Sequence, residues 1–320
     1  MNYISKDEFM SENNLPGVNV VKGIFWAAIA STLWGISGTV LQFIAQGQAI
    51  PAGWLLSTRT IGAGAILLIF SLFKYGMKSF NVFKSWRTIG WLLAYAVFGL
   101  MLNLLTFYYS VQTGNAASAT ILQYLSPLFI VVGSLVFKGI RPLRSDLIAF
   151  VISMLGVFLA ITKGDIHQLS IPLDSLLWGI GSGITAAFYV VLPRPVIEEH
   201  HSPILVLGWG TFIAGVLFNL NHPFWLDTPP ITGTLVASVM TVIVVGTILP
   251  FGLLLYSLNF APSDVVSIVD AVQPVMTFIL SVIFLSLDVS IVEIIGSALV
   301  IFAIYILQRG RRALDHELIE

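Results

Sequence analysis

The chain has 320 residues, of which 57% are hydrophobic and only 10% are charged. Because a soluble domain carries about 25% charged residues, this composition indicates a polytopic membrane protein. The net charge of −1 gives no sign of nucleic-acid binding, and the absence of cysteine leaves no disulfide or thiolate metal site. We expect no metal and no cofactor, because the histidines lie outside the apolar runs, at His167, His200, His201, His222 and His316.

Ten apolar segments approach the length of about 20 residues that a helix needs to cross the hydrocarbon core. In chain order they are residues 23–45, 52–73, 88–110, 116–137, 145–162, 173–193, 203–220, 232–258, 263–285 and 290–307. A short arm, residues 1–21, precedes them, and a charged tail, residues 309–320, follows them. The sequence therefore predicts an all-α protein with ten transmembrane helices.

Basic residues predict how these helices are oriented, because Lys and Arg gather in cytoplasmic loops. If the N-terminus is cytoplasmic, all but two of the 15 Lys and Arg residues fall on that side. The exceptions are Lys163, on the opposite side, and Arg59, within the second span. This bias places both termini in the cytoplasm of a cell whose inner or plasma membrane holds the protein, and it favours an even number of spans.

Residues 99–137 and 246–284 resemble each other at a constant offset without a gap. The identical pairs are Gly99 and Gly246, Leu102 and Leu249, Tyr109 and Tyr256, Ser110 and Ser257, Ile121 and Ile268, Pro127 and Pro274, Ser134 and Ser281, and Phe137 and Phe284. Each copy belongs to a set of five spans, 22–162 or 173–308, joined by a linker at 163–172. Since five is odd, the second copy enters the membrane inverted, an arrangement found in secondary transporters.

The ninth span carries a polar face at helical spacing, and the fourth span carries its counterpart. The ninth-span residues are Ser263, Ser267, Asp270, Pro274, Thr277 and Ser281, and the fourth-span residues are Ala116, Thr120, Gln123, Pro127, Ile130 and Ser134. Pro127 and Pro274 lack an N–H, so each is predicted to break its helix and leave the carbonyl of Gln123 or Asp270 unpaired. Both faces should meet protein or a water-filled cavity. The alternative is that small residues merely allow close packing and the prolines kink the helices.

Asp270 lies about 12 Å into the membrane, where a carboxylate is a candidate functional group. It is predicted to bind a substrate amine or a proton, the alternative being a buried acid that fixes helix packing. Arg59, about 10 Å below the end of the second span, is predicted to bind a substrate carboxylate or to anchor the helix by snorkelling. Further candidate cavity residues are Gln123, Trp34, Asn103, Tyr109, Tyr124, Tyr189 and Gln273, together with Gln42 and Tyr108.

Several of these residues follow a family pattern. Trp34 and Gly35 stand in a first span rich in alanine and serine, Arg59 stands in the second, and a tract runs from Tyr109 to Pro127 and recurs from Tyr256 to Pro274. In this order and spacing the chain resembles the drug/metabolite transporter superfamily, specifically its EamA-type ten-helix members. The resemblance implies an inner-membrane carrier of small metabolites, often amino acids or related compounds, and often an exporter.

The resulting prediction is a secondary active transporter of small polar metabolites that works by alternating access. Its cavity is expected between the repeats, lined by the fourth and ninth spans and by the first and sixth. No phosphate-binding loop is present, so the energy would come from a gradient of substrate or of protons. The expected partners are the substrate, protons and the lipid bilayer, with no obligatory protein partner. A facilitative channel or a scramblase-like pathway remains the alternative, whereas an enzyme would need a catalytic constellation that the spans lack.

Overall fold

The computed structural model describes residues 20–139, 141–163, 165, 169–261, 265–266 and 269–317, and within these ranges the chain is helical without a strand. The first half contains α2 (Val20–Gln42), η1 (Phe43–Gly47), α3 (Ala52–Tyr75), η2 (Gly76–Phe83), α4 (Trp86–Ala94), η3 (Tyr95–Met101), α5 (Leu102–Thr113), α6 (Ala116–Gln123), α7 (Ser126–Lys138) and α8 (Arg144–Thr162). The second half contains α9 (Leu173–Val191), α10 (Arg194–Glu198), α11 (Pro203–Asn221), α12 (Gly233–Ile243), η4 (Val244–Ile248), α13 (Leu249–Ser257), α15 (Val272–Leu285) and α16 (Ile291–Glu317).

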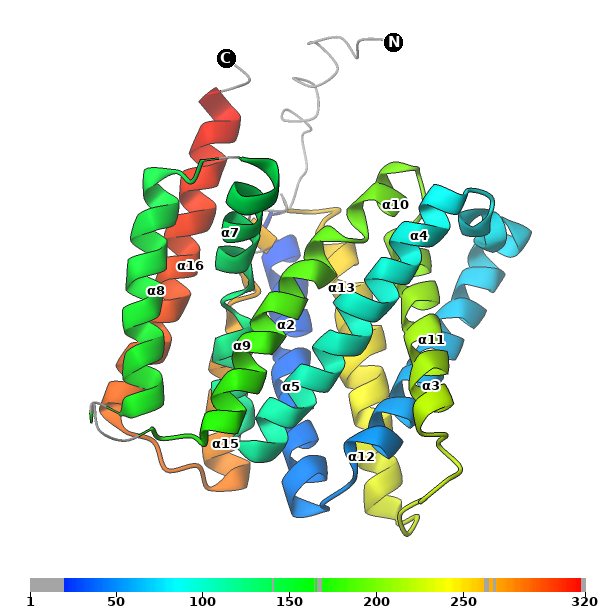
Figure 1. The fold of residues 1–320 in the computed structure, drawn as a ribbon, viewed down its shortest axis with the longest axis horizontal. Helices are drawn as coiled ribbons and strands as arrows, with labels where there is room; N and C mark the ends of the chain where they lie inside the picture. The colour runs from blue at the N-terminus through cyan, green and yellow to red at the C-terminus, as the bar shows by residue number, and fades with distance from the viewer. Residues whose placement is uncertain are drawn as a thin grey trace.

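Nine helical segments of the described chain are long and apolar enough to cross a membrane, and α15 is a shorter apolar helix of 14 residues. The predicted all-α polytopic membrane fold is therefore confirmed. In Figure 1 the segments form one bundle, in which α2 begins and α16 ends at the same end. Two residues of the predicted polar face, Ser263 and Ser267, lie outside the described residues.

The fourth span, predicted as one apolar segment with a break caused by Pro127, consists of two helices. The first piece, α6, ends at Gln123, and α7 begins at Ser126 with Pro127 in its first turn. A corresponding turn at Asp270 and Ala271 precedes α15, in which Pro274 is the third residue. The physical reason is that a proline cannot donate a hydrogen bond to the carbonyl four residues earlier. We call these two turns the first break and the second break.

Three spans change from α-helical to π-helical geometry along their length. The segments are η1 in the first span, η3 in the third and η4 in the eighth. At the offset of the sequence repeat, the second half of η3 corresponds to η4. A π-helical turn is rare and is frequently found at functional sites. Because π-helical turns recur at equivalent places in the third and eighth spans, we expect a functional site beside these two spans.

The helix pairs that pack most closely keep the same pattern when each span is exchanged for the one five spans away. With the spans counted in chain order, the first span (α2) packs on the eighth (α12 and α13) and the ninth (α15). The sixth span (α9) packs on the third (α5) and the fourth (α6 and α7). The second packs on the seventh, the fourth on the ninth and the fifth on the tenth. Figure 1 shows α8 beside α16 at one edge of the bundle and α3 beside α11 near the other. The breaks, α2 and α9 therefore meet in the middle.

The outer pair, α8 and α16, is joined by backbone contact and by charge. A methyl group on Gly156 would lie 2.7 Å from the carbonyl oxygen of Gly296, so only glycine allows the two helices to approach this closely. At one end of the pair, the Lys163 ammonium lies 3.2 Å from the Glu293 carboxylate. The same ammonium donates to the Asp288 carbonyl at 2.9 Å. These contacts fix α16 along α8.

Candidate functional site

Asp270 occupies the second break, immediately before α15. One carboxylate oxygen accepts a hydrogen bond from Ser31 of α2 at 2.9 Å. The Tyr124 hydroxyl donates to the Asp270 backbone carbonyl and also lies close to the carboxylate. The same carbonyl accepts from the backbone N–H of Gln273 at 3.0 Å. The prediction that this carbonyl is unpaired was therefore wrong, because the break lets two other donors reach it.

Among the described residues, the partners of the Asp270 carboxylate are hydroxyl groups, and none is a cation. The ion pairs among the described residues join Lys163 to Glu293 and His222 to Asp227, and neither lies at the second break. Ser31 also donates to the carbonyl of Ala27 at 3.0 Å, so its single proton is shared between two acceptors. A carboxylate with such partners can take up a proton or an external cation without first giving up an ion pair.

Gln123 occupies the first break and belongs to a closed network of neutral groups. Its amide donates to the Ser182 hydroxyl at 3.0 Å and to the Asn103 side-chain oxygen at 3.4 Å. The Asn103 amide donates in turn to the Ser182 carbonyl at 3.1 Å and to the Thr185 hydroxyl at 3.2 Å. The repeat counterpart of Asn103 is Pro250, which has no polar side chain. The second break therefore cannot form the same network.

The two breaks are connected to each other and to aromatic rings. Tyr124 follows Gln123 directly in the chain and makes its hydrogen bond to Asp270, so one residue joins both breaks. Beside them, ring centroids are 5.1 Å apart for Trp34 and Phe251, 6.0 Å for Phe251 and Tyr189, and 5.7 Å for Tyr189 and Tyr95. Tyr189 is also within electrostatic range of the Asp270 carboxylate.

Other predicted residues lie apart from this group. Arg59 is 9% exposed on α3, and no carboxylate pairs with it in the described ranges. Tyr109 stacks near Trp178, with ring centroids 5.1 Å apart. Within the described chain, no three His, Asp or Glu residues gather closely enough to bind a metal ion together. The candidate site is thus formed by the two breaks and the rings of α2, η3, α9 and α13.

A second polar group, at the end of the first span, holds the turn between α5 and α6. Gln42 accepts a hydrogen bond from the backbone N–H of Ala116 at 2.8 Å and donates to Gln46 at 3.1 Å. The Gln46 amide donates to three backbone carbonyls of the α5–α6 turn, those of Val111, Gln112 and Gly114, at 2.9, 3.2 and 2.6 Å. These two side chains close the bundle between η1 and α6.

The bundle is that of a multi-pass membrane protein, and comparison with known proteins identifies it as a transporter rather than an enzyme. Residues 21–162 and 174–309 each match the EamA-like transporter family, and the chain belongs to that family. The predicted resemblance is confirmed.

Relatives and a solved structure agree with this assignment. An uncharacterized inner membrane transporter, YicL of Salmonella typhimurium, is 31% identical over 294 residues, which cover 91% of this chain and 96% of the relative. An uncharacterized transporter of Archaeoglobus fulgidus is 24% identical over 220 residues, covering 68% of this chain and 76% of that one. One crystal structure superimposes with a TM-score of 0.60 at 16% identity, covering 92% of this chain and 98% of the other, and it shows the fold alone.

Proposed function

We propose that this protein is a secondary active transporter of small polar metabolites, with Asp270 as the group that binds a substrate amine or cycles a proton. The observation that carries the proposal is the carboxylate itself, which lies at a helix break in the middle of the bundle with hydroxyl partners and no cation among the described residues. A charge at such a depth is costly and is typical of substrate and proton pathways.

The packing of the spans supports alternating access between two inverted halves. Because the pattern of helix pairs is unchanged when the two halves are exchanged, the same set of helix pairs could open to either side of the membrane. Broken helices at the centre of such a bundle are where secondary transporters bind substrates and coupling ions. The predicted cavity between the halves would lie at the two breaks, open in turn to each side of the membrane.

Ser31 gives the carboxylate a way to change its protonation state without losing a partner. When Asp270 is ionised, the hydroxyl donates to it, and when Asp270 is protonated, the hydroxyl can donate to the Ala27 carbonyl instead. A substrate ammonium would serve the same purpose as the proton. The proposed substrates are therefore amines with a polar remainder, such as amino acids, and the aromatic rings beside the break would contact their apolar parts.

The proposed direction is export, as the family resemblance implies, and the proposed orientation has both termini in the cytoplasm. The alternative is a facilitative channel or scramblase-like pathway on the same fold. A channel would give flux that neither saturates nor increases when substrate is added on the opposite side. A carrier with one central site gives both effects.

The test is flux in liposomes containing purified protein, with substrate and pH gradients imposed separately. For Asp270→Asn we expect flux to fall by at least about tenfold and its pH dependence to disappear, since loss of 1.4 kcal/mol of interaction already gives a factor of ten. The matched control is Asp288→Asn, which makes the same change at an exposed carboxylate near the end of α15. Wild-type flux and pH dependence in Asp270→Asn would overturn the proposal.

A further inference from the structure

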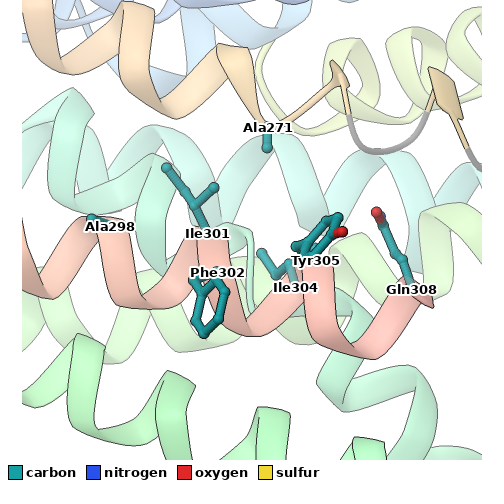
Figure 2. Close-up of a pocket in the computed structure, with 7 residues that line it drawn as sticks. All are labelled: Ala271, Ala298, Ile301, Phe302, Ile304, Tyr305 and Gln308. Carbon is teal, nitrogen blue, oxygen red and sulfur yellow. The ribbon is translucent and has the colours of Figure 1, made fainter. Parts of the chain in front are cut away.

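Two adjoining cavities lie along α16, the first between α16 and the second break and the second between α16 and α15. The first has a volume of about 370 Å³ and is lined by Ala271, Ala298, Ile301, Phe302, Ile304, Tyr305 and Gln308, as Figure 2 shows. The second has a volume of about 400 Å³ and is lined by residues of α15, α16 and α6. Because Ala298 and Ile301 line both, the cavities form one groove, which we call the α15–α16 groove. Each part lies in the size range of small-ligand sites.

The groove exists because two consecutive helices pack on different neighbours. In the part of the chain that the structure describes, α16 packs along α8, whereas α15 packs on α2 and α6. The groove side chains are almost entirely apolar, and Ile294, Val282 and Phe302 are exposed beside it. Since both helices belong to the membrane-spanning bundle, the groove faces the acyl chains of the bilayer.

The length of the first cavity matches one leaflet. From Ala298 to Gln308 it follows ten residues of α16, or about 15 Å at 1.5 Å per residue. The hydrocarbon core is about 30 Å thick, so one leaflet contributes about 15 Å. An acyl chain that enters beside Gln308 and extends through one leaflet would therefore reach Ala298.

The polar end of the groove has a positive charge beside it. Tyr305 and Gln308 are the polar residues that line the first cavity, and Figure 2 places both toward the same end. Arg309 follows Gln308 directly and is exposed. Arginine binds phosphate groups well, and basic residues next to a membrane span attract anionic lipids.

We propose that the α15–α16 groove binds one anionic phospholipid. Its phosphate lies beside Arg309, Tyr305 and Gln308, and one acyl chain occupies the groove from Gln308 to Ala298. The chain then contacts Ala271, the residue after Asp270, so the lipid supports the second break from the membrane side. This site is independent of the proposed function, because it would exist whatever the protein transports.

The experiment measures thermal unfolding of the purified full-length protein in detergent with added phosphatidylglycerol or phosphatidylcholine of identical acyl chains. A ligand that binds the folded state raises the melting temperature. For the wild type we expect phosphatidylglycerol to raise the melting temperature by about 2–4 °C more than phosphatidylcholine does. Equal shifts would overturn the proposal.

Two pairs of variants locate the site. Ala298→Phe fills the groove and should abolish the preference for phosphatidylglycerol, whereas Ala237→Phe, at an exposed alanine of α12, should keep it. Arg309→Gln should also abolish it, whereas Arg87→Gln, at an exposed arginine of α4, should not. A full preference in Ala298→Phe overturns the assignment to the groove. Native mass spectrometry tests the wild-type protein without any substitution. One retained phosphatidylglycerol molecule would support the site, and the absence of a retained lipid would overturn it.

Discussion

The two helix breaks occupy equivalent places in the fold but differ in how their polar groups are satisfied. At the first, the Gln123 amide donates hydrogen bonds to Asn103 and Ser182, Asn103 donates to the Ser182 carbonyl, and every group involved is neutral. At the second, the Asp270 carboxylate meets the hydroxyls of Ser31 and Tyr124. A neutral, mutually satisfied network favours a fixed structure, whereas a charge without a counter-charge favours exchange with a ligand. The first break therefore has the features of a structural element, and the second has those of a site that binds a ligand or a proton.

The strongest test moves the carboxylate from one break to the other. In the double variant Gln123→Asp with Asp270→Asn, the total charge is kept but its neighbours become Asn103 and Ser182. We expect substrate flux in liposomes to stay below about a tenth of the wild-type value, as for loss of 1.4 kcal/mol or more. Gln123→Asp alone is the control for damage at the first break. Recovery of wild-type flux in the double variant would show that the two breaks are interchangeable.

A smaller effect is expected when the link between the breaks is cut. Tyr124→Phe removes the donor to the Asp270 carbonyl and leaves only the Gln273 N–H there. We expect the free energy of unfolding to fall by about 1 kcal/mol, the net value of one hydrogen bond, with a several-fold loss of flux. Thermal unfolding and flux are measured together. Tyr256→Phe, at a half-exposed ring beside Trp26, is the control and should change neither.

The smallest expected effects come from the two serines, and they should differ in kind. Ser31→Ala removes the Asp270 partner and should shift the pH dependence of flux with little change in stability. Ser182→Ala opens the neutral network and should lower the melting temperature with little change in pH dependence. Each change removes a hydrogen bond between membrane helices, and such a bond contributes about 0.6 kcal/mol. The same response in both variants would contradict the division between the breaks.

Much of the fold could be predicted from the sequence, because apolar length and proline position are local properties. Spans of about 20 apolar residues predict crossing helices, and Pro127 and Pro274 mark where two of them are interrupted. Gln123 and Asp270 stood out for the same reason, since each is a polar residue four positions before a proline. These features depend only on neighbours in the chain.

The partners of these residues could not be predicted, because they depend on how each helix is rotated about its axis. Ser31 is 239 positions from Asp270, and hydropathy does not distinguish it from the other small polar residues of α2. Tyr95 and Phe251 were missed for the same reason, since hydropathy does not show which aromatic residues face the breaks. Arg59, which the family pattern did indicate, is buried on α3 and paired with no carboxylate of the described chain.

The Gln46 side chain has a consequence for how the bundle can open between η1 and the α5–α6 turn. One amide group donates to three carbonyls of that turn, and its neighbour Gln42 holds the first N–H of α6. Because these three hydrogen bonds start from one nitrogen atom, a rotation of the Gln46 side chain breaks them together. Any motion that separates η1 from the α5–α6 turn must therefore change this one rotamer and also release the Ala116 N–H from Gln42.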